Sequence, residues 1–380
     1  DKVVEARGAA HLLVTGVDFS RARIETLRDT VARNVTTGAV LRSLAGENFP
    51  LRDFPPGRTD TFGAFLQDEV SVADGRLAVT PGLRYDRVRL RPDADPLFDT
   101  RTVRPAVSKG DSRVSPKLAA AWQATPSLAA YAQWVTGFRA PNYDEVNGSF
   151  RNPVQGYGVM PNPGLAPETS RGAELGLRWG EGPFKAALAV YDNRYRDFID
   201  QVILACPGNP DCIAGLRVTY QNVNLSRVRI RGADLRASWE PAAGIRVQAS
   251  YSRTKGDDEE AGVPLNTVEP ARGALAVSVE RPRWGAEARV RAASAKTRIN
   301  DAELGAATYF RPAGYAVADL SAWWQPTKSA RVTLAVANLA DRTYYLWSDV
   351  RHVGLAATDP GPEFYSQPGR SFSVAFQAEF

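Results

Sequence analysis

The sequence predicts an all-β fold, an antiparallel up-and-down transmembrane β-barrel, and three observations support this prediction. Most segments alternate large apolar residues with small or charged ones. Short turns alternate with long loops, and tryptophans gather beside the short turns. Alternation at period two gives each strand one apolar and one polar face. Outer-membrane barrels have this pattern, with lipid outside and water inside.

The strands follow one another along the whole chain, and about fourteen are expected, most of them long enough to cross a bilayer at about 9–11 residues each. In one of them Leu175, Leu177 and Trp179 oppose Glu174 and Arg178. A soluble β-sandwich would show the same alternation, with its charged face outside. The predicted strands are Gly8–Ile24, Asp60–Ala73, Arg76–Leu90, Arg113–Gln123, Ser127–Arg139, Glu168–Trp179, Pro183–Ile199, Arg227–Trp239, Gly244–Thr254, Ala271–Glu280, Trp284–Thr297, Gly314–Trp324, Ala330–Tyr345 and Gly369–Phe380.

The last predicted strand is the most regular. Phe372, Val374, Phe376 and Phe380 alternate with small or polar residues, and the sequence ends on the last of these phenylalanines. This form is typical of the closing strand of an outer-membrane barrel. An edge strand of a soluble β-domain is the alternative.

Six of the eight tryptophans lie within a few residues of the short turns, so they share one rim of the predicted barrel. Indole is amphipathic and favours the membrane interface, where a ring of such side chains forms an aromatic girdle. The alternative is that tryptophan flanks turns in many β proteins. The predicted girdle consists of Trp122, Trp179, Trp239, Trp284, Trp323 and Trp324.

The composition excludes several classes of protein. No stretch of about 18 apolar residues occurs, so no transmembrane helix is expected. The net charge of +5 allows an anionic lipid or ligand, but the arginines are scattered singly rather than clustered with aromatics, which disfavours nucleic acid. Cys206 and Cys212 flank a turn-rich segment and predict a disulfide in an oxidising compartment. Two cysteines and two distant histidines are too few ligands for zinc.

The long loops should gather at the end opposite the tryptophans. Loops of this length are usually functional, so recognition is expected there. The first twenty residues lack the features of a signal peptide, so we expect either a removed signal or, preferably, a fragment. The predicted long loops are Glu25–Thr59, Arg91–Ser112, Asn142–Pro167, Gln201–Ser226, Lys255–Pro270, Arg298–Ala313 and Leu346–Pro368.

Two motifs bracket one of these loops: GFRAP at 137–141 and NPGLAPETS at 162–170. With them the chain resembles TonB-dependent outer-membrane receptors of the heme and hemoglobin class. The resemblance extends from about residue 60 to residue 380. It is also carried by FGAFLQDE at 62–69, GLRYD at 82–86, VANLADRTYY at 336–345, LWSDV at 346–350 and FYSQPGR at 364–370.

The resemblance implies a barrel of 22 strands around an N-terminal plug, a size class whose lumen is plugged. Residues 1–380 would then be the C-terminal part of the barrel domain, with the plug and its TonB-binding segment outside this chain. The implied function is uptake of heme, free or from hemoglobin or a hemophore, by a monomeric outer-membrane receptor driven by the TonB complex. Heme would be cargo, and no cofactor is expected.

Catalysis is not expected, because the two histidines are far apart and suggest no nucleophile–base pair. The carboxylates of residues 257–260 form an acidic loop tip, for which solvation is the preferred interpretation and a weak Ca²⁺ site the other.

A heme receptor needs an axial ligand, apolar walls and cations for two propionates. Related receptors often place a histidine between the two motifs, but residues 142–161 contain none. The possible ligands there are Tyr143, Tyr157 and Met160. We hypothesise that Tyr157 approaches the iron or stacks on the porphyrin, with simple packing inside the loop as the alternative.

His352, in the last long loop, is a second possible axial ligand, although a lone loop histidine is usually solvated. The other histidine, on the first strand, is expected to belong to the barrel wall. Arg151 and Arg351 are the loop cations best placed for propionates. Arg139 is a further possibility, but a structural role in joining strand to loop is the preferred interpretation.

Three other functions remain open at this stage. A ferric-siderophore receptor would have the same fold, and a complete fourteen-stranded passive channel would have the same strand pattern. A soluble β-sandwich adhesin is the fourth possibility, and it would stay in solution without detergent.

Overall fold

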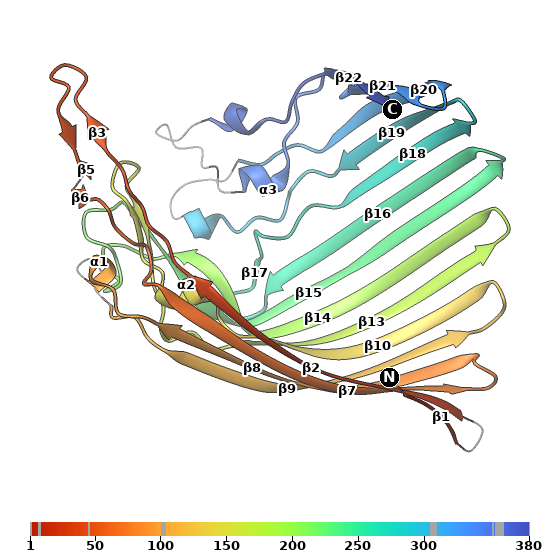
Figure 1. Ribbon diagram of the computed structural model, residues 1–380, viewed down its shortest axis with the longest axis horizontal. Helices are drawn as coiled ribbons and strands as arrows, with labels where there is room; N and C mark the ends of the chain where they lie inside the picture. Colours follow the sequence, from red (N-terminus) through yellow and green to blue (C-terminus); the bar gives the residue numbers. More distant parts are fainter. Residues whose placement is uncertain are drawn as a thin grey trace.

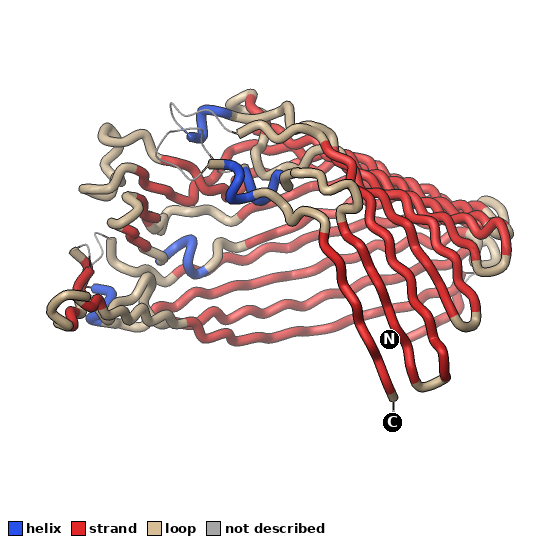
Figure 2. Tube along the Cα trace, turned by 90° about the horizontal axis from the view of Figure 1, so that it is seen from above, coloured by secondary structure: helices blue, strands red, loops and turns tan. Residues whose placement is uncertain are grey.

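The computed structural model describes residues 2–6, 9–44, 46–99, 104–304, 310–351, 353 and 361–379. These residues form one large sheet that curves like a section of a barrel wall (Figures 1 and 2). Each long strand pairs with its neighbours along the chain, and all of these pairings are antiparallel. The fold is therefore the predicted all-β, up-and-down arrangement.

All fourteen predicted strands are present, and one short strand precedes them. Within the described part of the chain, the two edge strands, β1 and β22, each pair on one side only. The strands in sheet order are β1 (Lys2–Ala6), β2 (Ala9–Ile24), β7 (Gly57–Val72), β8 (Leu77–Pro92), β9 (Lys109–Gln123), β10 (Leu128–Arg139), β13 (Glu168–Glu181), β14 (Phe184–Ile203), β15 (Val218–Ala242), β16 (Ile245–Asp258), β18 (Arg272–Arg281), β19 (Trp284–Ala293), β20 (Tyr315–Thr327), β21 (Ala330–Ala337) and β22 (Ser371–Ala378).

The strand ends differ most from the prediction on the side of the long loops. β15 begins nine residues earlier than expected, at Val218. β21 stops at Ala337 instead of Tyr345, because Asn338 adopts a positive φ of 50° and its amide nitrogen donates to the carbonyl of Arg342 at 2.8 Å. The motif at 336–345 is thus partly a turn, and alternation alone did not reveal where the strand ended.

Large apolar side chains cover the convex face of the sheet and are exposed there. Leu175 is 60% exposed, Val17 is 77% exposed and Phe372 is 74% exposed. Such a broad apolar surface is incompatible with water and fits a hydrocarbon environment. We call these outward side chains, from Val17 on β2 to Phe376 on β22, the apolar belt.

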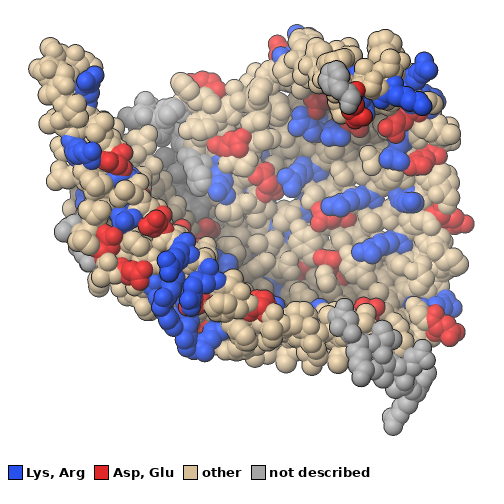
Figure 3. Space-filling view, in the orientation of Figure 1, with Lys and Arg blue, Asp and Glu red and all other residues tan. Residues whose placement is uncertain are grey.

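Charged and polar side chains lie on the concave face, mostly in pairs. Arg291 donates to Asp319 at 3.0 Å, and the hydroxyl of Tyr131 donates to Glu174 at 2.7 Å. Figure 3 shows both signs of charge interspersed over this hollowed face. The apolar sides are thus not stacked as a dry interior, which excludes the β-sandwich and supports an aqueous bore.

Five of the six predicted girdle tryptophans lie on the convex face near the short turns and are 41–57% exposed: Trp122, Trp179, Trp239, Trp284 and Trp324. Trp323 differs from the prediction, because it alternates with Trp324 and lies on the concave face. There its indole covers Gly285, where a Cβ would come within 2.3 Å of the ring nitrogen, and the Arg331 guanidinium stands 4.2 Å from its ring centroid.

The long loops gather at the opposite end and contain the remaining elements. Within the described ranges, no helix has the length and apolar character needed to span a membrane. The elements in the loops are β3 (Ala32–Arg33), β4 (Val40–Leu41), β5 (Ser43–Leu44), β6 (Glu47–Asn48), α1 (Pro96–Asp99), α2 (Tyr143–Asn147), β11 (Phe150–Asn152), β12 (Tyr157–Met160), β17 (Val263–Pro264), α3 (Trp347–Val350) and two 3-10 helices, η1 (Asp301–Leu304) and η2 (Pro362–Tyr365).

Candidate functional site

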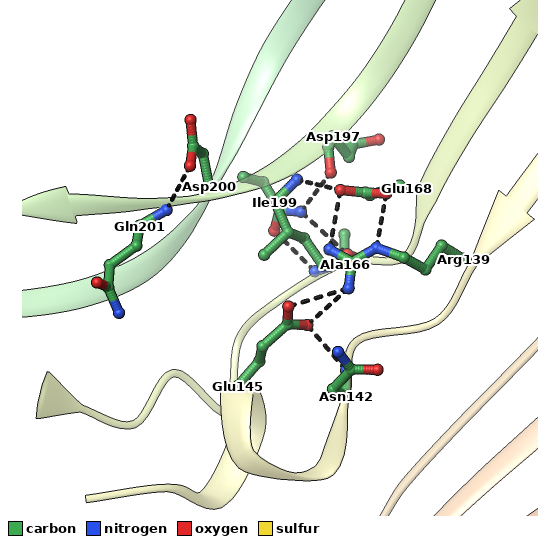
Figure 4. Close-up of polar contacts among 10 residues, drawn as sticks. Arg139, Asn142, Glu145, Ala166, Glu168, Asp197, Ile199, Asp200 and Gln201 are labelled. Atoms are coloured by element: carbon green, nitrogen blue, oxygen red, sulfur yellow. Dashed lines mark hydrogen bonds and ion pairs between the residues drawn. The ribbon is translucent and has the colours of Figure 1, made fainter. Parts of the chain in front are cut away.

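An arginine and two glutamates join the two sequence motifs that bracket the loop at 142–161. Arg139, the last residue of β10, donates from Nε to Oε2 of Glu168 at 2.7 Å and from Nη2 to Oε1 at 2.9 Å. Its Nη1 donates to Oε1 of Glu145 in α2 at 2.9 Å (Figure 4). All three guanidinium nitrogens are therefore occupied by carboxylates. This geometry favours the structural interpretation of Arg139 over a propionate role.

Backbone groups complete this cluster. Glu145 accepts a hydrogen bond from the backbone N–H of Asn142 at 2.8 Å, which closes a capping box at the start of α2. Glu168 accepts another from the backbone N–H of Ile199 at 2.6 Å. The amide of Asn224 donates to the carbonyls of Ala166 and Asp197, so β13, β14 and β15 are held together here. The cluster fixes both ends of the loop between the motifs.

Tyr143 is a packing residue in the structure. It is 4% exposed, and its hydroxyl donates to the carbonyl of Pro55 at 2.9 Å. The chain comes so close that a Cβ on Gly57 would lie 2.3 Å from the same hydroxyl. Burial raises the pKa of Tyr143, which keeps the phenol neutral. A buried, neutral and hydrogen-bonded phenol is poorly suited to bind iron.

Tyr157 lies in an aromatic group at the mouth of the loops, formed by Phe150, Tyr157 and Tyr220. The ring centroids of Tyr157 and Phe150 are 5.7 Å apart, and those of Tyr157 and Tyr220 are 6.2 Å apart with nearly perpendicular planes. Two pairings build the group, because β11 pairs with β12 and β12 runs parallel to the start of β15. Tyr157 is half-buried, and within the described residues its hydroxyl has no hydrogen-bond partner.

Two arginines lie close to this aromatic group in the fold, on different sides of the β11–β12 pair. Arg151 pairs with Gly158, so strand alternation places its side chain on the face opposite to Tyr157. There it donates to the carbonyl of Ala214 at 3.4 Å, and its Nε is buried with no partner in the described part of the chain. Arg28 stands 4.9 Å from the Phe150 ring centroid and is paired with Asp53 at 3.0 Å. The structure therefore places the side chains of Arg151 and Tyr157 on opposite faces of this pair, and the arginine that contacts the aromatic group is Arg28, which is paired with a carboxylate.

The other predicted residues do not join this group. Met160 is 4% exposed and lies on the buried side of β12, opposite to Tyr157. Arg351 caps α3, where its backbone N–H donates to the carbonyl of Trp347 at 2.9 Å and its Nε is buried without a partner among described residues. His352 lies outside the described residues.

The disulfide between Cys206 and Cys212 is present and closes the tip of the loop between β14 and β15. Asp211 within that tip pairs with Arg104 from the loop before β9. Gln221 of β15 joins the tip to the residue before the second motif, because its amide donates to Asp211 at 3.4 Å and to the carbonyl of Pro161 at 3.3 Å. The tip that the disulfide closes is therefore connected to the loop between the motifs.

A second loop cluster surrounds α3. Trp347 is 2% exposed, and its indole N–H donates to the carbonyl of Asn266 at 2.6 Å. Lys296 is 6% exposed, lies 4.8 Å from the Trp347 ring centroid and donates to the carbonyl of Val268 at 2.5 Å. Burial lowers the pKa of Lys296 to about 8. This cluster joins the loops on the C-terminal half of the sheet.

The acidic tip makes no candidate metal centre. Asp257 pairs with Arg298, and Asp258 accepts hydrogen bonds from the backbone of Glu260 and Ala261 as a turn cap. No group of three or more carboxylate, histidine or cysteine side chains arranged for a metal occurs in the ranges that the structure describes. His11 on β2 pairs with Asp68 at 2.8 Å, which places it in the wall as expected.

The concave face itself contains a hollow of about 840 Å³ toward the short-turn end. It is lined by small residues and by several cations, among them Arg178, Lys185, Arg236 and Arg289. Below the loops, the wall is thus open and positively charged.

Sequence reasoning missed Glu145, Glu168 and Phe150. The two glutamates had a signal, since Glu145 follows Asn142 by three residues as in a capping box and Glu168 belongs to the second motif. Phe150 lies beside Tyr157 through the local pairing of β11 with β12, whereas Tyr220 had no sequence signal, because only the parallel pairing of β12 with β15 places it there.

Comparison with known proteins places these features in a family. The sequence pattern described as "TonB dependent receptor-like, beta-barrel" matches residues 5–339. Among curated relatives, "Probable hemoglobin and hemoglobin-haptoglobin-binding protein 4" of Haemophilus influenzae is 21% identical, over 86% of this chain and 39% of its own length. "Hemoglobin-haptoglobin utilization protein B" of Neisseria meningitidis is 24% identical, over 80% of this chain and 42% of its own. The chain thus spans about two fifths of these relatives.

Solved structures of receptors and transporters share the fold. The copper transporter OprC matches with a TM-score of 0.72 and 19% identity, over 100% of this chain and 56% of its own. The ferric enterobactin receptor PfeA of Pseudomonas aeruginosa matches with a TM-score of 0.68 and 19% identity, over 99% of this chain and 53% of its own. The Serratia marcescens hemophore receptor HasR, solved with its hemophore and heme, matches with a TM-score of 0.68 and 18% identity, over 99% of this chain and 57% of its own.

Proposed function

The chain belongs to the TonB-dependent receptor β-barrel family, and from this premise we propose that it is part of an outer-membrane receptor that takes up heme, free or carried by hemoglobin or a hemophore. Members of this family are receptors and transporters of the outer membrane rather than enzymes. The curated relatives with hemoglobin in their names support heme as the cargo. The solved hemophore receptor supports it through its fold.

The aromatic group at the loop mouth is the observation that carries this proposal. A porphyrin is a flat apolar plate with two propionates, so it needs aromatic surfaces and nearby cations. Phe150, Tyr157 and Tyr220 offer such surfaces, and the Arg28 guanidinium stands 4.9 Å from the Phe150 ring centroid. A tyrosine oxygen can also bind ferric heme iron, and the hydroxyl of Tyr157 has no partner within the described residues.

In this proposal the loops bind and the wall conducts. Heme is captured at the end where the long loops gather, and its propionates meet arginine. The cationic hollow on the concave face then favours passage of an anionic cargo. Energy comes from the TonB complex of the inner membrane, acting through the plug that receptors of this family carry.

The test is a titration of the full receptor with hemin, followed in the ultraviolet–visible spectrum. We expect a shifted Soret band and a charge-transfer band in wild type, and we expect Tyr157→Phe to lose the charge-transfer band if its oxygen binds iron. A receptor whose spectrum with hemin equals that of free hemin would contradict the proposal.

A ferric-siderophore receptor is the second candidate, because the enterobactin receptor shares the fold and a ferric chelate is also anionic. Competition separates the two. If a ferric siderophore displaces hemin, or binds where hemin does not, the siderophore function holds. A passive fourteen-stranded channel has less support, since within the described strands β22 does not pair with β1 or β2 to close a pore.

A further inference from the structure

A row of three arginines crosses the convex face at the loop end of the first strands. Arg23 of β2 lies directly opposite Arg58 of β7, which lies opposite Arg91 of β8. Asp60 is the neighbouring carboxylate, and it is bound to Arg21 at 2.6 Å. The Nε of Arg58 is buried with no partner in the described residues. Figure 3 shows Lys and Arg gathered at the lower left, where β2 and β7 reach the loops.

A second row of the same kind crosses the middle of the sheet. Arg171 of β13 lies directly opposite Arg194 of β14, which lies opposite Arg229 of β15. Arg196 and Arg227 oppose each other one step closer to the loops. Like charges directly opposite one another destabilise a sheet, and an anionic ligand would relieve this repulsion.

Few carboxylates compensate this second row from within the chain. By strand alternation, Asp192 and Asp257 share its face, and Glu259 follows directly after β16. Asp192 pairs with Arg229 and lies 3.9 Å from Arg194, Glu259 lies 3.9 Å from Arg229, and Asp257 pairs with Arg298. Eight cations share the face, and all except Arg229 are exposed: Arg171, Arg194, Arg196, Arg227, Arg229, Arg231, Arg253 and Lys255.

The position of the two arginine rows along the strands indicates which part of the membrane they contact. The arginine rows continue the outward face of the same strands that carry the apolar belt, with Ala173 and Leu175 next to Arg171 along β13. The tryptophans occupy the other end of the belt. On the concave face at the loop end, Arg84 is paired with both Asp18 and Asp86. The two rows thus place an excess of positive charge on the outward face, at the level where a bilayer's headgroups begin.

We propose that the two arginine rows bind the phosphate groups of phosphorylated lipids in the surrounding membrane leaflet. Guanidinium presents a planar fork that binds phosphate oxygens in pairs, and basic residues beside a membrane attract anionic headgroups. Three adjacent strands place Arg171, Arg194 and Arg229 side by side, so one lipid carrying two phosphates can contact several of them. This inference rests on the membrane location and does not depend on heme.

The test compares two triple variants of the full receptor in detergent. R171Q/R194Q/R229Q removes three charges from the convex face, and R178Q/K185Q/R236Q removes three from the concave face of the same three strands. The probe is a bisphosphorylated diglucosamine lipid, with its dephosphorylated form and inorganic phosphate as the other arms. Bound lipid is counted by native mass spectrometry.

We expect the outer variant to bind the phosphorylated lipid at least fivefold more weakly than wild type, and the concave variant to match wild type. The single variant R194Q and the row variant R23Q/R58Q/R91Q give independent tests if the first triple does not fold. Equal binding by wild type and the outer variants would overturn the proposal. So would equal binding of the dephosphorylated lipid, or binding of inorganic phosphate without enrichment of the lipid.

Discussion

Arg139 and Glu168 form a two-pronged ion pair across 29 residues of sequence, with Nε–Oε2 at 2.7 Å and Nη2–Oε1 at 2.9 Å. Each residue belongs to one of the two motifs that identify the family in sequence. Their contact explains why the motifs occur together. It anchors the loop between them, and that loop carries the aromatic group.

Replacing Arg139 by glutamine should loosen this loop. The change leaves Glu145 and Glu168 without their cation. Because the arginine side chain is partly exposed, we expect a cost of about 2 kcal/mol rather than that of a fully buried pair. Limited proteolysis within residues 142–161 should become roughly thirtyfold faster. R178Q serves as the control, and an unchanged cleavage rate in R139Q would argue against the anchor.

The Lys296 cluster should become more stable as the pH rises. Burial lowers the pKa of Lys296 to about 8 in the folded protein, against 10.5 when exposed. Between these values the open loop binds more protons than the closed one, so opening becomes less favourable with rising pH, by up to about 1.4 kcal/mol per pH unit. Quenching of Trp347 fluorescence by a quencher dissolved in the buffer, which reaches this indole only when the loop opens, should therefore decrease from pH 8 to pH 10. Lys296→Met should abolish this dependence, and a dependence that persists in that variant would assign it elsewhere.

Removing the disulfide should free the tip of the loop between β14 and β15. Closure of so short a loop contributes about 2 kcal/mol in the chain-entropy description. We expect C206S/C212S to be cleaved between residues 205 and 217 under conditions where wild type is intact. Wild type treated with a reductant should behave like the double variant. Resistance of both would mean that the Arg104–Asp211 pair alone holds the tip.

Tryptophan quenching should separate the two faces of the sheet. In vesicles of brominated lipid, outward indoles are quenched and inward ones are protected. Replacing Trp179 by phenylalanine should remove part of the quenched signal, whereas W323F should remove only unquenched signal. The opposite result would place Trp323 in the lipid and reverse the assignment of faces.

Alternation was sufficient to predict the strands because every strand has one face toward lipid and one toward water. Strand alternation also places Trp323 and Trp324 on opposite faces. The predicted girdle included both because it was based only on their nearness to a short turn. Strand ends near the loops were less predictable, since they depend on local caps such as Asn338. The disulfide could be predicted because the sequence contains only two cysteines, which lie close together in one turn-rich segment.

The loop site was only partly predictable. Tyr157 and Phe150 come together because the short β11–β12 pair is a local structure, whereas Arg151 faces the other side of that pair. Tyr143 was a candidate on residue type, but its hydroxyl is used to hold the chain at Pro55. Tyr220 is brought to Tyr157 by the parallel pairing of β12 with β15, and no pattern within one segment encodes that contact.

The most direct measurement is the hemin affinity of Tyr157→Ala in the full receptor, beside Tyr251→Ala on the lipid-facing side of β16. Binding at the aromatic group predicts at least tenfold weaker hemin binding for Y157A and wild-type binding for Y251A. Hemin bound by Y157A as tightly as by wild type would contradict the proposed site.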